Sequence, residues 1–322
     1  MNRYQRQIQF IGEEGQKQLA SKTALVVGLG ALGSVAAELL ARAGIGKLIL
    51  VDRDIVELSN LQRQALYDET DVHKLKAIAA REKLKKINSS IQIESLAENF
   101  NEDFGAKADI LLDCTDNLET RFLINSFARK NKMPWIYCGI AGSQGRVLVM
   151  KDDFCFNCVF SGTKEALTCD DSGVLGSTAH MAASIQVTEA LKVLLNKEYC
   201  KDLIIFDVWK NSFEAIKVKK NENCAVCRNE KAREKESRNF RYEVRPCKTG
   251  AAYKTFPNKI LKVNLDEVRK NFDVVLDTPL LVVVKVENEE VIVHGFGELV
   301  FKTLRNEDKV KEISEQIYNL LL

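Results

Sequence analysis

Apolar and polar residues along the first hundred positions follow patterns typical of strands and helices in succession. Continuous apolar runs at Thr23–Val27 and Lys47–Val51 have the length of buried strands. Between them, Ala31–Ala43 carries apolar residues at helical spacing, after a short glycine-rich turn. The order strand, turn, helix, strand predicts a βαβ unit of a parallel sheet.

Similar patterns continue along the chain. Further strands are predicted at residues 91–95, 109–113, 134–138, 146–150, 203–209 and 213–217, and helices at 71–87, 118–132 and 173–195. Only three residues separate the last two strands, which indicates an antiparallel hairpin. We therefore expect an α/β fold with a Rossmann-like mixed sheet, parallel first and antiparallel later, with helices on both faces.

The chain is predicted to contain two domains joined by a charged segment. Residues 1–227 hold the α/β pattern, residues 228–241 alternate in charge with little apolar content, and residues 242–322 form a small α+β module. In this module, strands are predicted at 281–286, 291–294 and 298–302, and helices at 266–272 and 307–320.

The turn after the first strand has the spacing of a nucleotide-binding loop. Gly28, Gly30 and Gly33 form a G-x-G-x-x-G pattern, and Asp52 follows the second strand, nineteen residues after Gly33. Such a turn allows phosphate to approach the backbone at a helix N-terminus, and the acid holds a ribose hydroxyl. An ordinary βαβ turn or a dinucleotide dehydrogenase also fits this pattern alone.

The residues after the second strand favour a nucleoside triphosphate over a redox cofactor. Asp52 and Asp54 are followed by Asn60, Arg63 and Gln64. A redox dinucleotide needs only the ribose acid here. A triphosphate under attack needs cations on its phosphates and carboxylates for a metal ion.

Two Cys-x-x-Cys pairs form a second group of candidate residues, Cys155 with Cys158 and Cys224 with Cys227. Four thiolates suit tetrahedral Zn²⁺, and sixty-five residues separate the pairs, so the site would join distant parts of the chain. A redox pair is the alternative and would need only one of them. Nine cysteines without an apolar leader favour a reducing, cytoplasmic location.

Composition excludes two classes of partner. The net charge is only +2 and no basic block occurs, which gives no indication of nucleic-acid binding. The most membrane-like stretch, residues 24–41, contains three glycines and Glu38, and it fits strand plus helix better than a membrane span.

Several motifs, in order and spacing, resemble the MoeB/ThiF/HesA family of ubiquitin-activating-type adenylyltransferases. They are VDRDIVELSNLQRQ at residues 51–64, RYQRQIQFIGEEGQKQL at 3–19, DCTDN at 113–117, both cysteine pairs, and ALTC at 166–169 with a Gly-Val pair soon after. The resemblance covers residues 3–227.

The resemblance implies adenylylation, with ATP and Mg²⁺, of the C-terminal glycine of a small ubiquitin-like sulfur-carrier protein ending in Gly-Gly. It implies a homodimer in which Arg6 reaches the partner's ATP site, and a possible sulfur-donor enzyme. Arg63 and Lys76 would hold phosphates. Asp116 would hold Mg²⁺, although Asp116 or Asn117 is equally placed to cap the following helix.

Cys169 is the family's candidate for covalent sulfur chemistry. The adjacent Asp170 and Asp171 disfavour a thiolate, so a cysteine on a mobile loop is the competing interpretation. The chain departs from the family pattern just beyond, where it carries Ser177 and His180.

Other functions remain open at this point. An adenylyltransferase acting on a peptide or a tRNA-linked carboxylate is one alternative, and a dinucleotide-dependent oxidoreductase is another. The sequence leaves open which pathway is served, whether thiamine, molybdopterin, tRNA thiolation or another.

Overall fold

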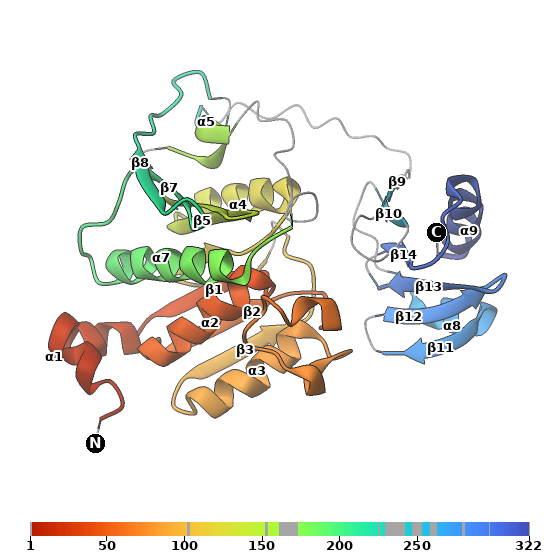
Figure 1. Cartoon of the computed structure of the whole chain (residues 1–322), viewed down its shortest axis with the longest axis horizontal. Coiled ribbons are helices and arrows are strands. Elements are labelled where there is room, and N and C mark those ends of the chain that lie inside the picture. Colours follow the sequence, from red (N-terminus) through yellow and green to blue (C-terminus); the bar gives the residue numbers. More distant parts are fainter. Residues whose placement is uncertain are drawn as a thin grey trace. The chain divides into compact units, whose positions relative to one another are not determined.

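The structure is a computed structural model that describes residues 2–101, 104–151, 154–160, 173–224, 226–228, 242–246, 253–257, 263–278, 281–295 and 297–321. It separates into two compact units, Met1–Ala232 and Arg233–Leu322, and each is described by itself (Figure 1). The boundary falls within the segment 228–241, most of which lies outside the described residues.

An eight-stranded mixed sheet forms the first unit, in the order β3-β2-β1-β4-β5-β6-β7-β8. Its strands are β1 (Thr23–Val27), β2 (Lys47–Val51), β3 (Gln92–Leu96), β4 (Ile110–Asp113), β5 (Trp135–Ala141), β6 (Gln144–Met150), β7 (Leu203–Asp207) and β8 (Ser212–Ile216). Pairing is parallel from β3 through β5 and antiparallel from β5 through β8. The predicted mixed sheet is therefore confirmed.

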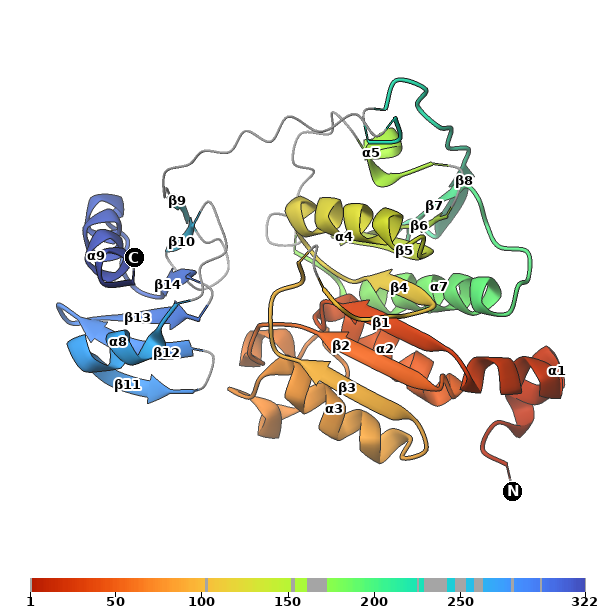
Figure 2. The same cartoon turned by 180° about the vertical axis from the view of Figure 1, so that it is seen from behind.

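Helices cover both faces of this sheet. They are α1 (Gln5–Ala20), α2 (Ala31–Ala43), α3 (Lys76–Ile87), α4 (Leu118–Lys130), α5 (Phe156–Phe160) and α7 (Gly176–Leu194), with short 3₁₀ turns at Leu58–Asn60 and Glu69–Asp71. Helices α2, α3 and α7 share one hydrophobic core, and α4 and α5 share another. Figure 2 shows β1 to β3 in front of α2 and α3.

The central strands are buried on both faces because helices cover each side. Leu25 and Ile49 point into the core with α4, whereas their neighbours Val26 and Leu50 point into the core with α2. Successive side chains of a strand alternate between faces, so such strands must be apolar throughout. This accounts for the unbroken apolar runs in the sequence.

A six-stranded antiparallel sheet, ordered β11-β12-β13-β14-β10-β9, forms the second unit. Its elements are β9 (Tyr242–Pro246), β10 (Tyr253–Pro257), α8 (Leu265–Asn271), β11 (Asp273–Asp277), β12 (Leu281–Val286), β13 (Glu289–His294), β14 (Leu299–Phe301) and α9 (Glu307–Leu321). Helices α8 and α9 pack on one core with the central strands. The sequence did not predict β9, β10 and β11, because two end in proline and every residue of β11 is exposed.

Within the described residues, no helix is both long and apolar enough to cross a membrane.

Candidate nucleotide site and cysteine cluster

The glycine turn leads from β1 into α2 and is closely packed beneath. At Gly28 (φ 88°) a Cβ would lie 2.7 Å from the carbonyl oxygen of Cys114, and at Gly33 it would lie 1.8 Å from the carbonyl oxygen of Gly28. Beside Gly30, by contrast, the nearest atom to such a Cβ is Gln64 Nε2, at 3.8 Å. No side chain caps α2, so no side chain occupies the hydrogen-bonding positions at the start of the helix. The turn is therefore shaped to accept phosphate.

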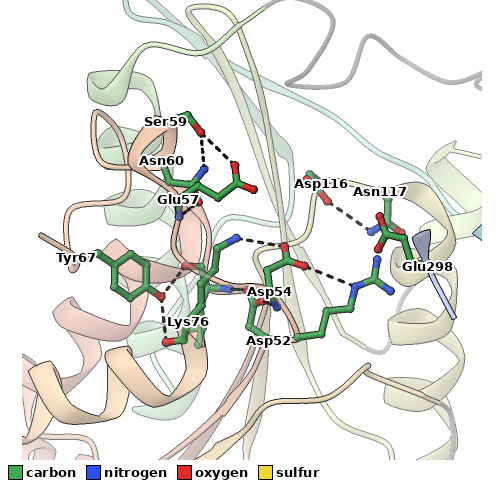
Figure 3. Close-up of polar contacts among 12 residues, drawn as sticks. Asp52, Asp54, Glu57, Ser59, Asn60, Tyr67, Lys76, Asp116, Asn117 and Glu298 are labelled. Atoms are coloured by element: carbon green, nitrogen blue, oxygen red, sulfur yellow. Dashed lines mark hydrogen bonds and ion pairs between the residues drawn. The ribbon is translucent and has the colours of Figure 1, made fainter. Parts of the chain in front are cut away.

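Charged residues reach this turn from both sides, because β1 lies between β2 and β4. Asp52 and Asp54 follow β2, and Asp116 follows β4. The crevice outside the carboxyl ends of such strands, where the strand order changes direction, is where ligands bind in open α/β sheets. Figure 3 shows these side chains together with Lys76.

Asp52 holds the glycine turn from one side. Its Oδ2 accepts a hydrogen bond from Leu29 N (2.6 Å), and its Oδ1 accepts one from Asp54 N (2.7 Å). Burial raises the pKa of the Asp52 carboxyl to about 6, Asp54 adds to the rise, and Lys76 opposes it.

The Tyr67 hydroxyl holds the same turn by donating to Leu29 O (3.0 Å) and is visible in Figure 3. Sequence reasoning missed this buried residue. The only sign of it in the sequence was a single aromatic residue three positions after Gln64.

Lys76 lies in the first turn of α3 and points to Asp54, with Nζ 3.2 Å from Oδ2 (Figure 3). Burial alone would lower the pKa of this lysine, but Asp54 and Asp52 raise it well above its usual range, and Asp116 contributes. Lys76 is thus a buried cation that stays charged at neutral pH.

The predicted start of this helix at residue 71 was wrong, since α3 begins at Lys76. Val56 N donates to Lys74 O and His73 N to Val56 O, so this segment pairs with the chain after β2 instead of continuing as helix. Lys74 lies before the helix and pairs with Asp71 (3.1 Å), away from Asp54. The pairing explains why Lys76, and not Lys74, faces the crevice.

Asn60, Arg63 and Gln64 lie on the turn that starts at Leu58. The Asn60 side chain accepts from Glu57 N (3.2 Å), and Arg63 Nη1 donates to Ser59 O (3.0 Å). Gln64 is buried beside Gly30, and within the described chain its Oε1 has no hydrogen-bond partner. This oxygen is available to accept a hydrogen bond from a donor on a bound water or ligand, while the Gln64 Nε2 faces Gly30.

The structure resolves which residue caps α4. Asn117 Oδ1 accepts from Thr120 N (2.8 Å), which is the capping interaction. The Asp116 carboxylate is exposed, and its Oδ1 accepts a longer hydrogen bond from Asn117 Nδ2 (3.5 Å; Figure 3). Asp116 is therefore not needed to cap the helix.

Arg6 is exposed on α1, which lies at the far end of α2 from the glycine turn. Gln7 Nε2 and Gln16 Nε2 both donate to Ala43 O at the C-terminus of α2 (2.8 and 3.0 Å). The thirteen residues of α2 span about 20 Å, so Arg6 lies far from the phosphate cradle of its own chain.

The two cysteine pairs meet despite their separation in sequence. The sulfur atoms of Cys155, Cys158, Cys224 and Cys227 all lie within 4.8 Å of one another, with closest approaches of 3.4 to 3.8 Å. Four thiolates around one tetrahedral ion, with metal–sulfur bonds of 2.3 Å, would lie about 3.8 Å apart. The cluster therefore has the donor set and spacing for one metal ion.

Helix α4 supports this cluster. The buried Asn125 accepts from Phe156 N (3.0 Å) and donates to Asn157 Oδ1 (3.0 Å), and Arg129 Nη1 donates to the Cys227 sulfur (3.7 Å). Cys169, with Asp170 and Asp171, lies outside the described residues. The helix predicted from residue 173 begins at Gly176 and includes Ser177 and His180.

Comparison with known proteins finds one family for most of the first unit. A model described as the ThiF family matches residues 4–226. The chain is 40% identical over 239 residues to the Bacillus subtilis sulfur carrier protein ThiS adenylyltransferase, covering 70% of this chain and 71% of the relative. It is 35% identical to the Salmonella typhimurium molybdopterin-synthase adenylyltransferase, covering 70% of this chain and 96% of the relative.

Solved structures share the fold. A crystal structure titled E. coli MccB + MccA-N7isoASN superposes with a TM-score of 0.64 at 22% identity, covering 70% of this chain and 75% of that one. A structure titled E. coli MccB + ATP gives 0.63 at 23% identity, covering 71% and 75%. At these identities the likeness concerns the fold.

Proposed function

The chain belongs to the ThiF family, and from this we propose that it is an adenylyltransferase acting on the C-terminal glycine of a small ubiquitin-like sulfur-carrier protein ending in Gly-Gly. The observation that supports the proposal most is the crevice itself. It joins an open phosphate cradle at Gly30 to a buried, charged Lys76 and to an exposed Asp116 that is not the cap of α4.

The reaction needs positioning and charge stabilisation more than proton transfer. A carboxylate oxygen of the carrier's terminal glycine forms a bond to the α-phosphorus of ATP, and the bond from that phosphorus to the bridging oxygen breaks. Pyrophosphate leaves with the electron pair, and the acyl-adenylate remains. Because the carboxylate is already a nucleophile, no general base is required.

The residues of the crevice divide these tasks. Gly28, Gly30 and Gly33 with the first amides of α2 cradle phosphate, while Asp52 accepts from the ribose hydroxyls. Lys76 and Arg63 offset phosphate charge. Asn60 and Gln64 line the nucleotide, and Asp54 holds Lys76 in place (3.2 Å). Asp116 would hold Mg²⁺, which when bound would supply positive charge to offset that of the phosphates.

A homodimer completes the site in this proposal. Arg6 cannot reach its own cradle, but its exposed position allows it to enter a partner's crevice. Phe10, on the same helix, is 92% exposed in the single chain. A second chain covering α1 in the proposed dimer would bury this side chain.

The carrier protein has a suitable surface at the antiparallel end of the sheet. All five residues of edge strand β8 are exposed, and they include Phe213 and Ile216. Trp209, in the preceding turn, is 77% exposed while its backbone N–H donates to Asp207. A fixed apolar surface beside an open strand edge fits a protein partner better than a small molecule.

ATP–pyrophosphate exchange tests the proposed function. Small proteins ending in Gly-Gly from the native host would be purified and added with ATP and Mg²⁺. We expect exchange with one carrier and none with the same carrier lacking its final glycine. Exchange driven by a peptide or a tRNA-linked carboxylate, or tight NADH binding without exchange, would contradict the assignment.

We propose that the four-cysteine cluster holds structural zinc, at about one ion per chain. Replacing Cys155 with serine is expected to lower metal content and melting temperature together, because a structural ion contributes to folding free energy. Elemental analysis and thermal melting measure both. Cys200→Ser, which alters a thiol outside the cluster, serves as the control, and a metal-free wild type would contradict the assignment.

ATP affinity is expected to weaken below pH 6. The Asp52 pKa is raised to about 6 in the folded, ligand-free protein. Since ribose hydroxyls donate to the ionised carboxylate, ATP binding must expel the proton, and the dissociation constant should rise up to about tenfold per pH unit below 6. For folding the sign is opposite: because the Asp52 pKa rises from 3.8 to about 6 on folding, its stabilising contribution is full below pH 3.8 and is lost as pH rises through 6.

Titration calorimetry from pH 5 to 8 measures this dependence. Asp52→Asn should bind ATP more weakly, and its dissociation constant should depend less steeply on pH below 6. The phosphates of ATP titrate equally with both proteins and so do not affect the comparison. Equal slopes for wild type and variant would show that Asp52 does not contact the ribose.

Cys169→Ala should keep near-normal pyrophosphate exchange. Adenylylation needs a carboxylate, ATP, Mg²⁺ and cations, and none of these roles calls for a thiol. Any loss should appear when sulfur delivery to the carrier is measured with a sulfur donor in the same preparation. A variant as inactive in exchange as Arg63→Ala would place the thiol in the adenylylation step.

A further inference from the structure

The carboxyl ends of β4 and β5 separate just below the crevice. The ladder between them comprises only Leu111 with Trp135 and Leu112 with Ile136, after which β5 continues in its pairing with β6. Two side chains from opposite faces bridge the two strands at this point. Gln186, from α7, donates from Nε2 to Asp113 O (2.8 Å) and to Ile136 O (2.9 Å).

Arg121, in the first turn of α4, forms the second bridge. Its Nη2 donates to Thr115 O (2.7 Å) and to Cys138 O (3.3 Å), which replaces the missing ladder bonds beyond Gln186. Its Nε lies 3.3 Å from Asp113 Oδ2, and its guanidinium lies 5.1 Å from the centre of the Tyr137 ring. The Arg121 side chain is 12% exposed and that of Asp113 fully buried, so this is a desolvated ion pair.

This ion pair lies directly behind Asp116. Asp113 Oδ1 accepts from Thr115 N (3.0 Å) and from Thr115 Oγ1 (2.6 Å), so Asp113 and Arg121 hold Thr115 from both its N–H and its carbonyl. On the other side, Asn117 is held as the cap of α4. The backbone of Asp116 is therefore fixed at both neighbours, while its carboxylate is exposed and close enough to Lys76 to help raise the pKa of that lysine.

The electrostatic interactions of Arg121 also connect it to Asp116. Burial alone would lower the pKa of Arg121, but Asp113 raises it overall, and Asp116 adds to the rise. The planar guanidinium reaches one carboxylate and two carbonyl groups at once, which the single ammonium of lysine cannot do. Among the described residues around Asp116, Arg121 therefore does more than occupy space in the core, because its side chain ties together groups from separate parts of the chain.

We propose that Arg121 is a positioning residue for adenylylation: it fixes the Asp116 carboxylate for Mg²⁺ by holding Thr115 and Asp113. The inference rests on the proposed function. Arg121 is too deeply placed to be a phosphate ligand, since Asp113, Thr115, Cys138 and Tyr137 surround its guanidinium. Its effect should pass entirely through Asp116.

ATP binding at graded Mg²⁺ concentrations tests the inference without a carrier. In titration calorimetry of the full chain, Arg121→Gln should raise the Mg²⁺ concentration for half-maximal enhancement of ATP affinity by about tenfold or more, as expected for a displaced metal ligand. Arg121→Lys, which keeps the charge opposite Asp113, should recover part of this loss. It also serves as the second variant if Arg121→Gln does not fold.

Gln186→Leu is the matched control, because Gln186 bridges the same two strands but does not hold Thr115. It should lower the melting temperature, as Arg121→Gln does, and keep the Mg²⁺ dependence of wild type. A normal Mg²⁺ dependence in Arg121→Gln, or an equal shift in Gln186→Leu, would show that Arg121 is only structural and overturn the inference.

A double-mutant cycle with Asp116→Asn completes the test. If Arg121 acts through Asp116, the double variant should bind Mg²⁺ and ATP no more weakly than Asp116→Asn alone. Losses that add would overturn the inference, as would a wild type whose ATP affinity ignores Mg²⁺. Failure of the proposed function shows differently, as absence of carrier-dependent exchange in a wild type that still binds Mg²⁺ and ATP.

Discussion

Mixing Arg6→Ala chains with Asp116→Ala chains is expected to restore pyrophosphate exchange that neither variant has alone. In the proposed dimer each crevice combines Asp116 of one chain with Arg6 of the other. Loss of either charged group should lower exchange by about a hundredfold or more. A mixed dimer contains one crevice with both groups intact and one with neither. With random pairing, half the dimers are mixed, so about a quarter of wild-type activity should return.

The two variants are mixed after mild dissociation, and exchange is measured against each variant treated alone. Arg3→Ala is a suitable control, because Arg3 donates to Ile87 O within its own chain (3.1 Å) and should keep activity. No recovery in a mixture whose exchange of subunits has been verified would show that Arg6 does not act across the dimer.

Lys76→Met is expected to lower exchange by about a hundredfold or more, whereas Lys74→Met should stay within about threefold of wild type. Lys76 is 9% exposed and is the buried cation facing Asp54. Methionine leaves Asp54 and Asp52 without this charge and removes a cation from the phosphate cradle. Lys74 is 45% exposed, and its partner Asp71 keeps a second lysine, Lys83, at 2.9 Å. Because Lys83 still pairs with the buried Asp71, losing the half-exposed Lys74 should cost little.

Lys74 and Lys76 make a matched comparison, because they lie two residues from each other and carry the same charge. Circular dichroism and thermal melting would show whether Lys76→Met remains folded, and ATP binding would show where activity is lost. Comparable exchange in both variants would remove Lys76 from the assigned site. A deeper loss in Lys74→Met would mean that the wrong lysine had been chosen.

The comparison of these lysines also shows how far sequence reasoning reaches. The apolar runs determine β1 and β2, the G-x-G-x-x-G spacing locates the turn, and motif resemblance selects Lys76 over Lys74. Helical periodicity alone places both lysines in one first turn. Only the pairing of Val56 with His73 and Lys74 shows that the helix begins two residues after Lys74.

The four paired cysteines and the polar residues after β4 illustrate the same limit. Two Cys-x-x-Cys pairs indicate a metal, but they meet only because the chain folds to bring together Cys155 and Cys224, which are 69 positions apart. Whether Asp116 or Asn117 caps α4 was an even choice in the sequence. The structure assigns the cap to Asn117 because its side chain reaches Thr120 N.

By itself, the sequence determined the order of strands and helices, the glycine turn, the donor set for a metal and the family. These features depend on residues close together in the chain, where periodicity and spacing carry the information. The tertiary structure alone decided that Tyr67 holds the turn, that β4 and β5 separate, and that Arg121 joins Thr115 to Cys138. Such contacts depend on how far-apart segments pack, and buried polar groups find their partners only once that packing exists.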